Sequence, residues 1–372
     1  MISSTPHTVE FGWVGVHVRL SCDSKPLADM VRRLWGLNAS LIPGRRTPRR
    51  NYVIDLDGSE EPVFRGPGGE RFLDHKDPAL HAYNLLVSDL LGIVRDHFVF
   101  HATSVGKEGR AVVLSGPTTF GKTTLGIHLA NLGFDLLADD LTIVERGTGR
   151  ILPFRRLLRL RPGTRRTLDD DQLERAREAT REILGDEWAV DPGRWFGEAP
   201  GACSISMVAI LRPHTDGEGL RSFPYYEIRV TEGQEAILRD LEGLEGIRSV
   251  QESANDPAYV RVEASNTGPL IRWLRENHDS LVYGIKQASG PPEFDGEPRL
   301  EPLGPFQAAL ELCQEMLNRH EGSILADEFR QREVSLVTEV AERLGRAQCF
   351  ALLPGRLEDT LQLLTERFES AA

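Results

Sequence analysis

The sequence predicts an α/β protein with a central core, an N-terminal α+β domain and an inserted domain of βαββαβ order. The core is predicted from a short apolar run at residues 111–115, followed by a glycine-rich loop and a helix-spaced segment at 125–130. Residues 1–95 and 220–288 each alternate strand-like and helix-like patterns of their own. The predicted divisions are therefore the N-terminal domain (1–95), the first part of the core (96–219), the insert (220–288), and a linker that leads into the completion of the core (289–372).

The N-terminal part shows β-type runs at residues 11–20 and 51–56, and helical spacing at 25–37 and 79–91. The next apolar run, residues 98–105, predicts a strand that carries His101. A turn at 106–109 would bring His101 back towards the glycine-rich loop. A lone histidine in a strand is also compatible with a hydrogen-bonded core residue, and spacing alone leaves both roles open.

The glycine-rich loop reads Gly-Pro-Thr-Thr-Phe-Gly-Lys-Thr-Thr over residues 116–124, which completes the pattern G-x-x-x-x-G-K-[ST]. Its glycines let successive backbone N–H groups face one concavity, and the following helix adds its partial positive charge. This arrangement predicts ATP and Mg²⁺ as ligands. The predicted nucleotide-binding residues in the loop are Gly116, Thr118, Thr119, Phe120, Gly121, Lys122, Thr123 and Thr124. Lys122 would reach the β- and γ-phosphates, and the Thr123 hydroxyl would be a ligand to Mg²⁺.

Two adjacent acids, Asp139 and Asp140, interrupt an apolar run at residues 133–145. An acid at the end of a core strand beside such a loop can hold Mg²⁺, and a second acid can accept a proton from an attacking hydroxyl. The alternative is an aspartate-rich turn between two hairpin strands. The neighbouring loop favours the catalytic interpretation.

Several arginines follow at residues 152–162, including Arg156 and Arg161, on a short extended segment. They could bind phosphates, bind an anionic substrate, or lie on a solvated face. The acid run at 169–171 begins a segment with charges at i,i+3 and i,i+4 spacing, which predicts a solvated helix rather than a metal site.

Residues 202–212 predict a buried strand of the core. The insert is predicted as a ferredoxin-like unit with elements at 222–230, 232–244, 247–252, 259–263, 269–276 and 280–286. Its expected role is to hold or gate a partner; a stabilising appendage is the alternative. After a Gly/Pro-rich linker at 290–298, helices at 306–319 and 326–344, a strand at 349–353 and a helix at 357–368 would complete the core.

Composition limits the classes of partner. The 372 residues are 40% hydrophobic, enough for a large core in two or three domains. The net charge of −12 argues against nucleic-acid and membrane-surface partners, which usually require a basic balance. No apolar run is long enough for a membrane span, residues 1–20 lack a signal-peptide pattern, and the four cysteines form no C-x-x-C pair. We therefore expect a cytoplasmic protein with reduced thiols.

Four segments together resemble the HPr serine kinase/phosphorylase family, and in particular its HPr-kinase-like branch, which includes kinases that modify lasso peptides. They are "FHATSV" with His101, "GPTTFGKTT", "LADD" with Asp139 and Asp140, and "PFRRLLRLRP". The resemblance is good over residues 96–163, looser at 204–213 and weak in "CFALLPGRLEDTLQLL". It implies an HPr-kinase-like P-loop core in which Asp139 accepts the proton of the substrate hydroxyl, Asp140 supports Mg²⁺, and His101 matches the family's histidine.

The sequence departs from that family at two points. Thr124 follows the loop Lys-Thr where HPr kinases have a glutamate, and no copy of their later Arg-Gly-x-Gly segment is found. These departures disfavour HPr itself as the acceptor and leave phosphorolysis without support. HPr kinases assemble as oligomers, so a homo-oligomer is an expectation that only the resemblance supplies.

The resulting prediction is an ATP-dependent kinase that transfers the γ-phosphoryl group to a hydroxyl, with serine of a peptide or protein as the expected acceptor. The predicted catalytic residues are Asp139, His101 and Lys122; Arg161 joins the nucleotide-binding set, and Thr123 and Asp140 form the metal set. One alternative is a kinase of the same fold that acts on a sugar or metabolite hydroxyl. Another is a binding protein that ATP switches without phosphoryl transfer.

Overall fold

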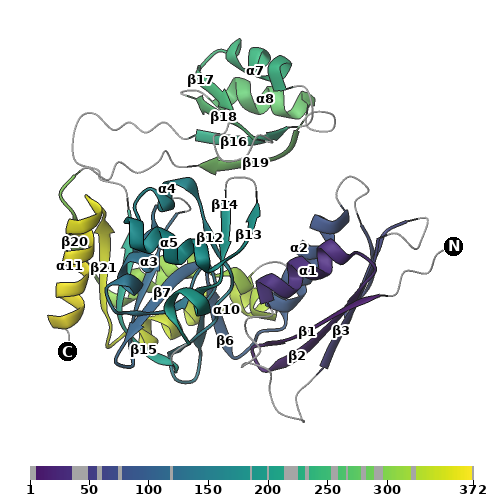
Figure 1. Ribbon diagram of the computed structural model, residues 1–372. Helices are drawn as coiled ribbons and strands as arrows, with labels where there is room; N and C mark the ends of the chain where they lie inside the picture. The colour runs from purple at the N-terminus through teal and green to yellow at the C-terminus, as the bar shows by residue number, and fades with distance from the viewer. Residues whose placement is uncertain are drawn as a thin grey trace.

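The computed structural model describes residues 6–35, 49–56, 61–73, 78–117, 120–184, 187–198, 201–212, 225–230, 234–252, 259–264, 267–277, 282–288, 296–319 and 324–370. These residues form a mixed α/β structure with several sheets (Figure 1), which confirms the α/β class. Within this part of the chain the sheets have five, nine, three and four strands.

The five-stranded sheet is N-terminal and has the order β1-β2-β3-β4-β5. Helices α1 (Lys25–Trp35) and α2 (Pro78–Gly92) pack on it, and Trp13 and Trp35 meet edge to face at 5.0 Å. The hydrophobic cluster of this sheet continues into Phe154 of the central region. The run predicted as one strand at 11–20 is a hairpin, and β4 and β5 were not predicted. The strands are β1 (His7–Trp13), β2 (Val16–Cys22), β3 (Arg49–Asp55), β4 (Val63–Gly66) and β5 (Gly69–Phe72).

The nine-stranded sheet forms the centre of the molecule. Its path is β6-β10-β11-β15-β8-β7-β9, and β21 pairs with β15 and β20. Strands β8, β15 and β21 run parallel to one another. The strands are β6 (His97–Phe100), β7 (Ala102–Lys107), β8 (Arg110–Ser115), β9 (Asp135–Ala138), β10 (Thr142–Glu145), β11 (Arg150–Leu152), β15 (Cys203–Leu211), β20 (Arg299–Leu303) and β21 (Gln348–Leu353).

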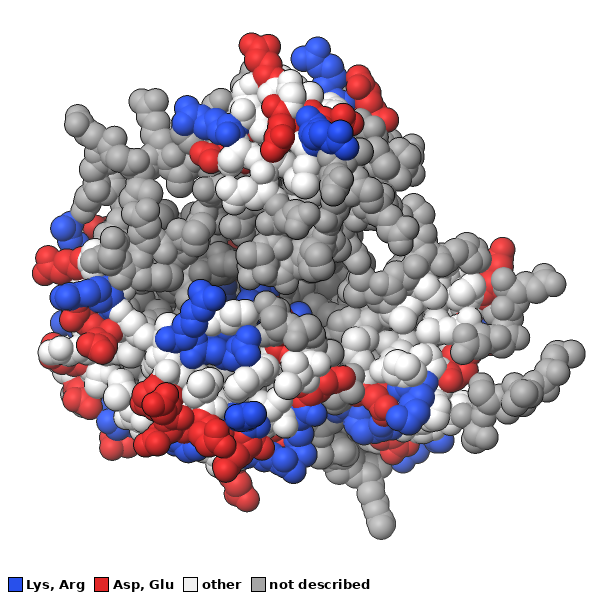
Figure 2. Space-filling view, turned by 45° about the horizontal axis from the view of Figure 1, so that its top comes forward, with Lys and Arg blue, Asp and Glu red and all other residues white. Residues whose placement is uncertain are grey.

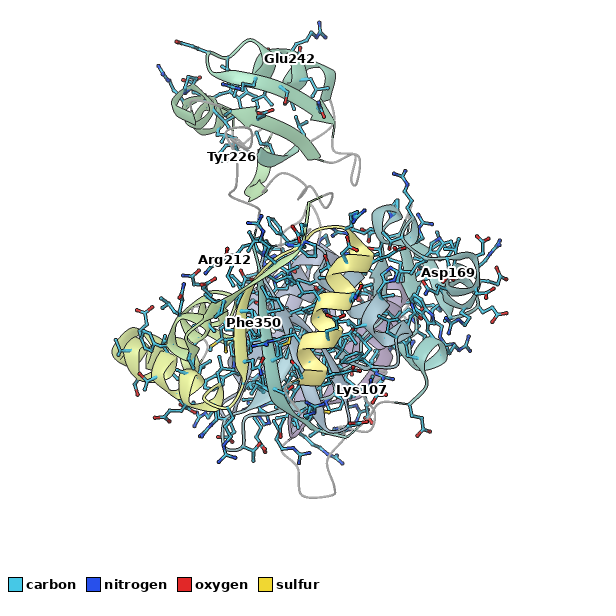
Figure 3. The ribbon with its side chains drawn as sticks, turned by 90° about the vertical axis from the view of Figure 1, so that its left-hand side faces the viewer. Lys107, Asp169, Arg212, Tyr226, Glu242 and Phe350 are labelled. Atoms are coloured by element: carbon cyan, nitrogen blue, oxygen red, sulfur yellow. The ribbon has the colours of Figure 1, made fainter. Side chains whose placement is uncertain are left out.

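Helices cover both faces of this central sheet because its strands are apolar on both sides. In β8, Val112 and Leu114 contribute to one hydrophobic cluster, while Ala111 and Val113 contribute to another. The first cluster packs under α3 (Lys122–Asn131) and α11 (Leu357–Ser370), and Figure 3 shows α11 beside Phe350. The second packs under α9 (Pro305–Gln314) and α10 (Ile324–Arg343). The helix predicted at 306–319 ends at Gln314, and a short 3₁₀ turn (Leu317–Arg319) follows.

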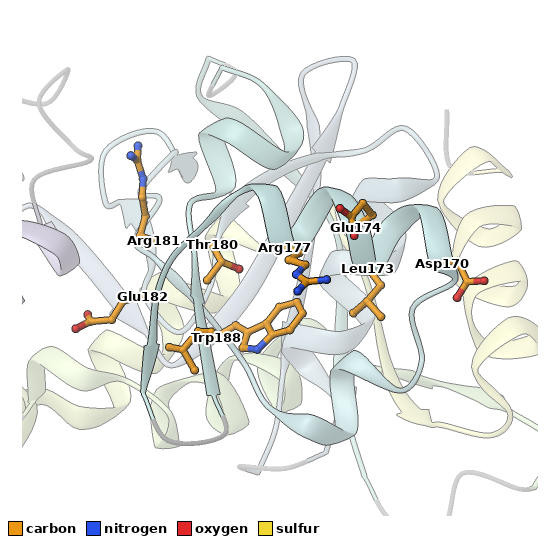
Figure 4. A pocket seen from close by; sticks show the side chains of 9 residues that line it. Asp170, Leu173, Glu174, Arg177, Thr180, Arg181, Glu182 and Trp188 are labelled. Atoms are coloured by element: carbon orange, nitrogen blue, oxygen red, sulfur yellow. The ribbon is translucent and has the colours of Figure 1, made fainter.

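The chain forms a three-stranded sheet of order β12-β14-β13 after β11 and before it returns to the central sheet at β15. Its strands are β12 (Leu158–Leu160), β13 (Thr180–Leu184) and β14 (Glu187–Val190), and its helices are α4 (Pro162–Arg165), α5 (Asp170–Glu178) and α6 (Pro192–Phe196). Helix α5 begins with a capping box between Asp169 and Gln172, at the predicted start of the solvated helix. The prediction extended this helix to Glu182, but it ends at Glu178 and the residues from Thr180 onwards form β13. A cavity of about 980 Å³ is lined by residues of α5, β13 and Trp188 (Figure 4), and it contains no predicted site residue.

The four-stranded sheet has the order β17-β18-β16-β19, and each neighbouring pair is antiparallel. Ile228, Leu241 and Trp273 belong to a separate hydrophobic cluster inside this unit. The elements follow the predicted βαββαβ order, while the independence of this unit stays a prediction. Residues 222–224, 231–233, 280–281 and the linker at 289–295 lie outside the described residues. The elements are β16 (Tyr225–Val230), α7 (Gln234–Glu242), β17 (Ile247–Glu252), β18 (Tyr259–Ala264), α8 (Thr267–Asn277) and β19 (Val282–Ala288).

Acidic and basic side chains are interspersed over the described part of the face in Figure 2. Among the described helices, none combines the length and the apolar composition that a membrane span requires. Cys22, Cys203, Cys313 and Cys349 are all buried and form no disulfide with one another.

Candidate active site

Three chain segments meet at one edge of the central sheet. Strand β8 ends there at Ser115, β9 ends there at Ala138, and β7 begins there at Ala102. The register pairs Ala102 with Ser115 and Ser104 with Ala138, so the segments that follow or precede these residues are neighbours. The sheet therefore brings together the glycine-rich loop, the two acids and His101, which the sequence separates.

The loop requires glycine at both ends. Gly116 has φ 138°, and a Cβ at this position would lie 2.7 Å from the Leu211 carbonyl oxygen. Gly121 has φ 90° and caps α3 without a side-chain hydrogen bond. Because glycine has no side chain to accept from the first N–H groups of α3, these groups can donate to an anion at the helix N-terminus. The predicted binding residues Thr118 and Thr119 lie outside the described residues, and Phe120 packs its side chain in the core.

Lys122 lies in the concavity of the loop. Its Nζ donates to the carbonyl oxygens of Gly116 at 2.7 Å and of Pro117 at 3.1 Å. Burial lowers the pKa of Lys122, and the charges of Asp140, Glu315 and Asp139 oppose this change. The ammonium group is therefore held against the backbone of the glycine-rich loop.

Asp139 is held by two hydroxyl groups. Thr103, which is fully buried on β7, donates from Oγ1 to Asp139 Oδ1 at 2.6 Å, and Thr123 donates to the same oxygen at 2.9 Å. Burial and the charge of Asp140 raise the pKa of Asp139 to about 6, although both hydroxyl hydrogen bonds lower it. The carboxyl group of Asp139 therefore gains and loses its proton at a pH just below neutrality.

Asp140 has a different environment although it is the next residue. Its backbone takes the left-handed conformation with φ 63°, and its side chain is 44% exposed. Its carboxylate lies 3.6 Å from His101 Nε2 and 3.7 Å from Arg156 Nη2. Burial opposes ionisation, but His101 and Arg156 outweigh it and lower the pKa of Asp140 to about 2. Asp140 therefore stays ionised.

His101 lies between two carboxylates. The predicted strand 98–105 is broken at this residue, because its backbone N–H donates to the Glu315 carbonyl oxygen at 2.8 Å instead of to a neighbouring strand. Its Nδ1 is 3.2 Å from Glu315 Oε2, and its Nε2 faces Asp140. Hydrogen bonds to Asp140 and Glu315 raise the pKa of His101 to about 9. The ring is thus a cation at neutral pH, and Glu315, which the sequence did not indicate, is one of its partners.

The arginines of residues 155–161 divide into three groups. Arg155 is buried and donates to the carbonyl oxygens of Leu136 and Gly197, which is a structural role. Arg156 pairs with Asp140. Arg159 and Arg161 both pair with the carboxylate of Glu187.

A cavity of about 490 Å³ collects most of these side chains. The predicted site residues that line it are His101, Gly121, Lys122, Thr123, Thr124, Asp139, Asp140 and Arg161. The other lining residues are Leu125, Arg159, Gly163, Thr164, Thr167, Pro354, Gly355, Leu357 and Thr360. Thr124 hydrogen-bonds the Thr164 hydroxyl at 2.9 Å.

The donor set of this cavity fits Mg²⁺ bound together with a nucleotide. Within the described residues, no three His, Cys, Asp or Glu side chains are grouped as a metal site. Mg²⁺ usually uses one or two carboxylates, substrate phosphates and water, so a dedicated cluster is not required. Thr123 and Asp140, the predicted metal ligands, both line the cavity, but the Thr123 hydroxyl donates to Asp139 rather than to Asp140.

Comparison with known proteins does not assign the chain to a family. No family model matches the chain, and no curated protein matches it. The chain is similar to the solved structure of the HPr(Ser) kinase/phosphatase from Coxiella burnetii, with 14% identity over 49% of this chain and 90% of that chain, at a TM-score of 0.22. A TM-score this low carries no argument about fold or activity, so membership of that family stays a prediction.

Proposed function

We propose that the protein is an ATP-dependent kinase of the HPr-kinase-like type that transfers the γ-phosphoryl group to a hydroxyl. The observation that carries the proposal is the cavity of about 490 Å³, which collects Lys122 of the glycine-rich loop with Asp139 and Asp140 from a separate strand end. A phosphate-binding loop alone would suit any nucleotide-binding protein. A proton acceptor beside it is what transfer to a hydroxyl requires.

In this proposal Asp139 takes the proton as the O–H bond of the acceptor breaks. The acceptor oxygen forms a bond to the γ-phosphorus while the bond to the β-phosphate oxygen breaks, and ADP leaves with that electron pair. A base whose pKa lies near neutrality is suited to this step, and the pKa of Asp139 is raised to about 6 by burial and Asp140. Lys122 stabilises the negative charge on the phosphates.

His101 and Arg156 keep Asp140 ionised, as a metal ligand must be. Mg²⁺ held by Thr123 and Asp140 would neutralise charge on the β- and γ-phosphates. The hydrogen bond from Thr123 to Asp139 supports a second assignment, in which Asp139 lies at the metal and Asp140 is the base. The Mg²⁺ dependence of asparagine variants at the two positions distinguishes these assignments.

The proposed acceptor is a serine of a peptide or protein, with a small-molecule hydroxyl as the alternative within the same reaction class. The proposed division into a core (96–219 and 289–372) and an inserted domain (220–288) is supported by the separate hydrophobic cluster around Ile228 and Trp273. The homo-oligomer implied by the resemblance stays a prediction.

Lys122→Met tests the proposal. We expect ATP affinity, measured by isothermal titration, to fall at least about tenfold, and phosphoryl transfer from labelled ATP to be lost, because the phosphates lose the compact cation of the loop. Lys25→Met is the matched control, because Lys25 is 71% exposed on α1 and pairs with Asp29. Unchanged ATP affinity and turnover in Lys122→Met would remove the proposed function. ATP binding by the wild type without transfer to any peptide or metabolite would favour the ATP-switched binding protein.

A further inference from the structure

Arg159 on strand β12 and Arg161, which directly follows the strand in extended conformation, form a pair. The side chains of a strand alternate between its two faces. Leu158 and Leu160 are buried in the core, so the arginines at positions 159 and 161 share the opposite face. Both line the cavity that contains Lys122 and the two acids.

One buried carboxylate holds both guanidinium groups. Glu187 is the first residue of β14 and is only 8% exposed. Leu160 pairs with Trp188 in the antiparallel register of β12 and β14, so Glu187 lies opposite Arg161. Its Oε2 pairs with Arg159 Nη2, and its Oε1 accepts from Arg161 Nε at 3.1 Å. Burying a carboxylate is costly unless cations pair with it, so these contacts fix the position of the arginines. The three side chains together keep a charge of +1.

These arginines have hydrogen-bonding capacity beyond Glu187. A guanidinium has five N–H donors, and the contacts with Glu187 engage one nitrogen of each. The side chains of Arg159 and Arg161 are 59% and 42% exposed. The other cations of the cavity are engaged elsewhere, because His101 lies between Asp140 and Glu315, and Lys122 donates to carbonyl oxygens of the glycine-rich loop. The arginine pair is therefore a second place where an anion can bind.

The chain segment that carries this pair also contacts one of the two acids. Arg156, earlier in the same segment, lies against Asp140, and the segment continues from there into Arg159 and Arg161. An acceptor whose hydroxyl lies at the acids can extend along this segment, whereas the nucleotide phosphates extend along the loop of Gly116 to Thr123. The planar fork of arginine suits a carboxylate or a phosphate on such an acceptor.

We propose that Arg159 and Arg161, held by Glu187, bind an acidic group of the acceptor, so that the preferred acceptor carries a carboxylate or phosphate near its hydroxyl. This inference depends on the proposed kinase function. It moves Arg161 from the nucleotide-binding set predicted from the sequence to the acceptor site. It also makes charge, rather than shape alone, a determinant of which hydroxyl is used.

The test measures binding to the wild-type protein saturated with Mg²⁺ and a non-hydrolysable ATP analogue, which occupies the phosphate loop. The first pair of probes is a serine peptide flanked by glutamates and the same peptide flanked by glutamines. The second pair is glycerate and glycerol. We expect the charged member of at least one pair to bind about tenfold more tightly, with a preference that weakens in high salt. The pair that shows the preference identifies a peptide or a small molecule as the source of the acid.

The double variant Arg159→Gln/Arg161→Gln should lose this charge preference and keep the affinity for the ATP analogue within about twofold. Arg166→Gln is the matched control, an exposed arginine just beyond α4 that does not line the cavity. Equal binding of charged and neutral probes by the wild type, including no binding of either, overturns the inference and leaves the kinase proposal in place. A loss of analogue affinity in the double variant with the charge preference intact places the arginines on the nucleotide and also overturns it. If the analogue fails to bind the wild type, the proposed function itself fails.

Discussion

Thr103→Val should raise the pKa of Asp139, because it removes one of the two hydroxyl groups that donate to Asp139 Oδ1. Valine keeps the branched shape of threonine at this fully buried position on β7. The change therefore removes the hydrogen bond and leaves the packing against Gly126 in place, where Thr103 Cγ2 fills the space that a Cβ would need.

The magnitude follows from the donor that is lost. A hydrogen bond to a charged group contributes about 1.5–3 kcal/mol, and one pKa unit corresponds to about 1.4 kcal/mol. The pKa of Asp139, which burial and Asp140 raise to about 6 in the wild type, should therefore rise by a further ~1–2 units. In an active enzyme, the acidic limb of the kcat/KM profile should move up by the same amount, with activity recovered above about pH 8.5.

A metal-free unfolding experiment measures the same shift without an acceptor. Because the pKa of Asp139 is higher in the folded than in the unfolded chain, stability is lost as pH rises through the folded pKa. The free energy of unfolding of Thr103→Val, relative to the wild type, should fall by a further ~1.5–3 kcal/mol between pH 5 and pH 8.5. Thr103→Ser is the matched control, because it keeps the hydroxyl and loses the methyl group. Its deficit should not depend on pH. If the deficits of both variants are equally independent of pH, the hydrogen bond to ionised Asp139 does not have the strength assigned here.

Three further predictions concern the loop, the acids and the insert. Gly116→Ala should weaken ATP binding by about tenfold or more, because φ is 138° and the added Cβ would lie 2.7 Å from the Leu211 carbonyl oxygen, so the loop must move. Gly147→Ala is the control, because its added Cβ meets nothing within 4 Å. Equal titration curves for the two variants would refute the reasoning. Asp139→Asn should lower turnover by about 10²-fold with Mg·ATP affinity kept, while Asp140→Asn should raise the Mg²⁺ requirement; the reverse result assigns the metal to Asp139. Replacement of residues 220–288 by a flexible linker should preserve ATP binding. If the insert recruits the acceptor, the replacement should also raise the KM for the acceptor. An insoluble product or lost ATP binding would place these strands in the core.

Much of the fold was predictable wherever the signal is local. The strand, loop and helix at residues 111–131 follow from contiguous residues, since glycines set the turn and apolar spacing sets the flanking elements. The buried strand β15 and the order of elements in β16 to β19 were read from periodicity in the same way. The short strands β12, β13 and β14 have too few residues for a periodic pattern; of these, β13 and β14 were not predicted and β12 appeared only as an extended segment.

The partners of the site residues could not be read from the sequence because they are distant along the chain. Glu315 lies 214 positions from His101, and Glu187 lies 26 positions from Arg161 on another strand. Nothing near these glutamates in the sequence distinguishes them from solvated surface acids. Thr103 is likewise an ordinary strand residue until the pairing of β7 with β9 brings it to Asp139.

The sequence by itself determined that a histidine, a glycine-rich loop of the phosphate-binding pattern and two adjacent acids occur in this order. Only the tertiary structure decided how the two acids differ. Asp139 and Asp140 are chemically identical and both half-buried, but one accepts hydrogen bonds from hydroxyl groups of β7 and α3, and the other faces cations at His101 and Arg156. Burial raises the pKa of the first, and the cations lower the pKa of the second. A pKa depends on solvent and charge around the group, and both are set by segments that meet only when the chain folds.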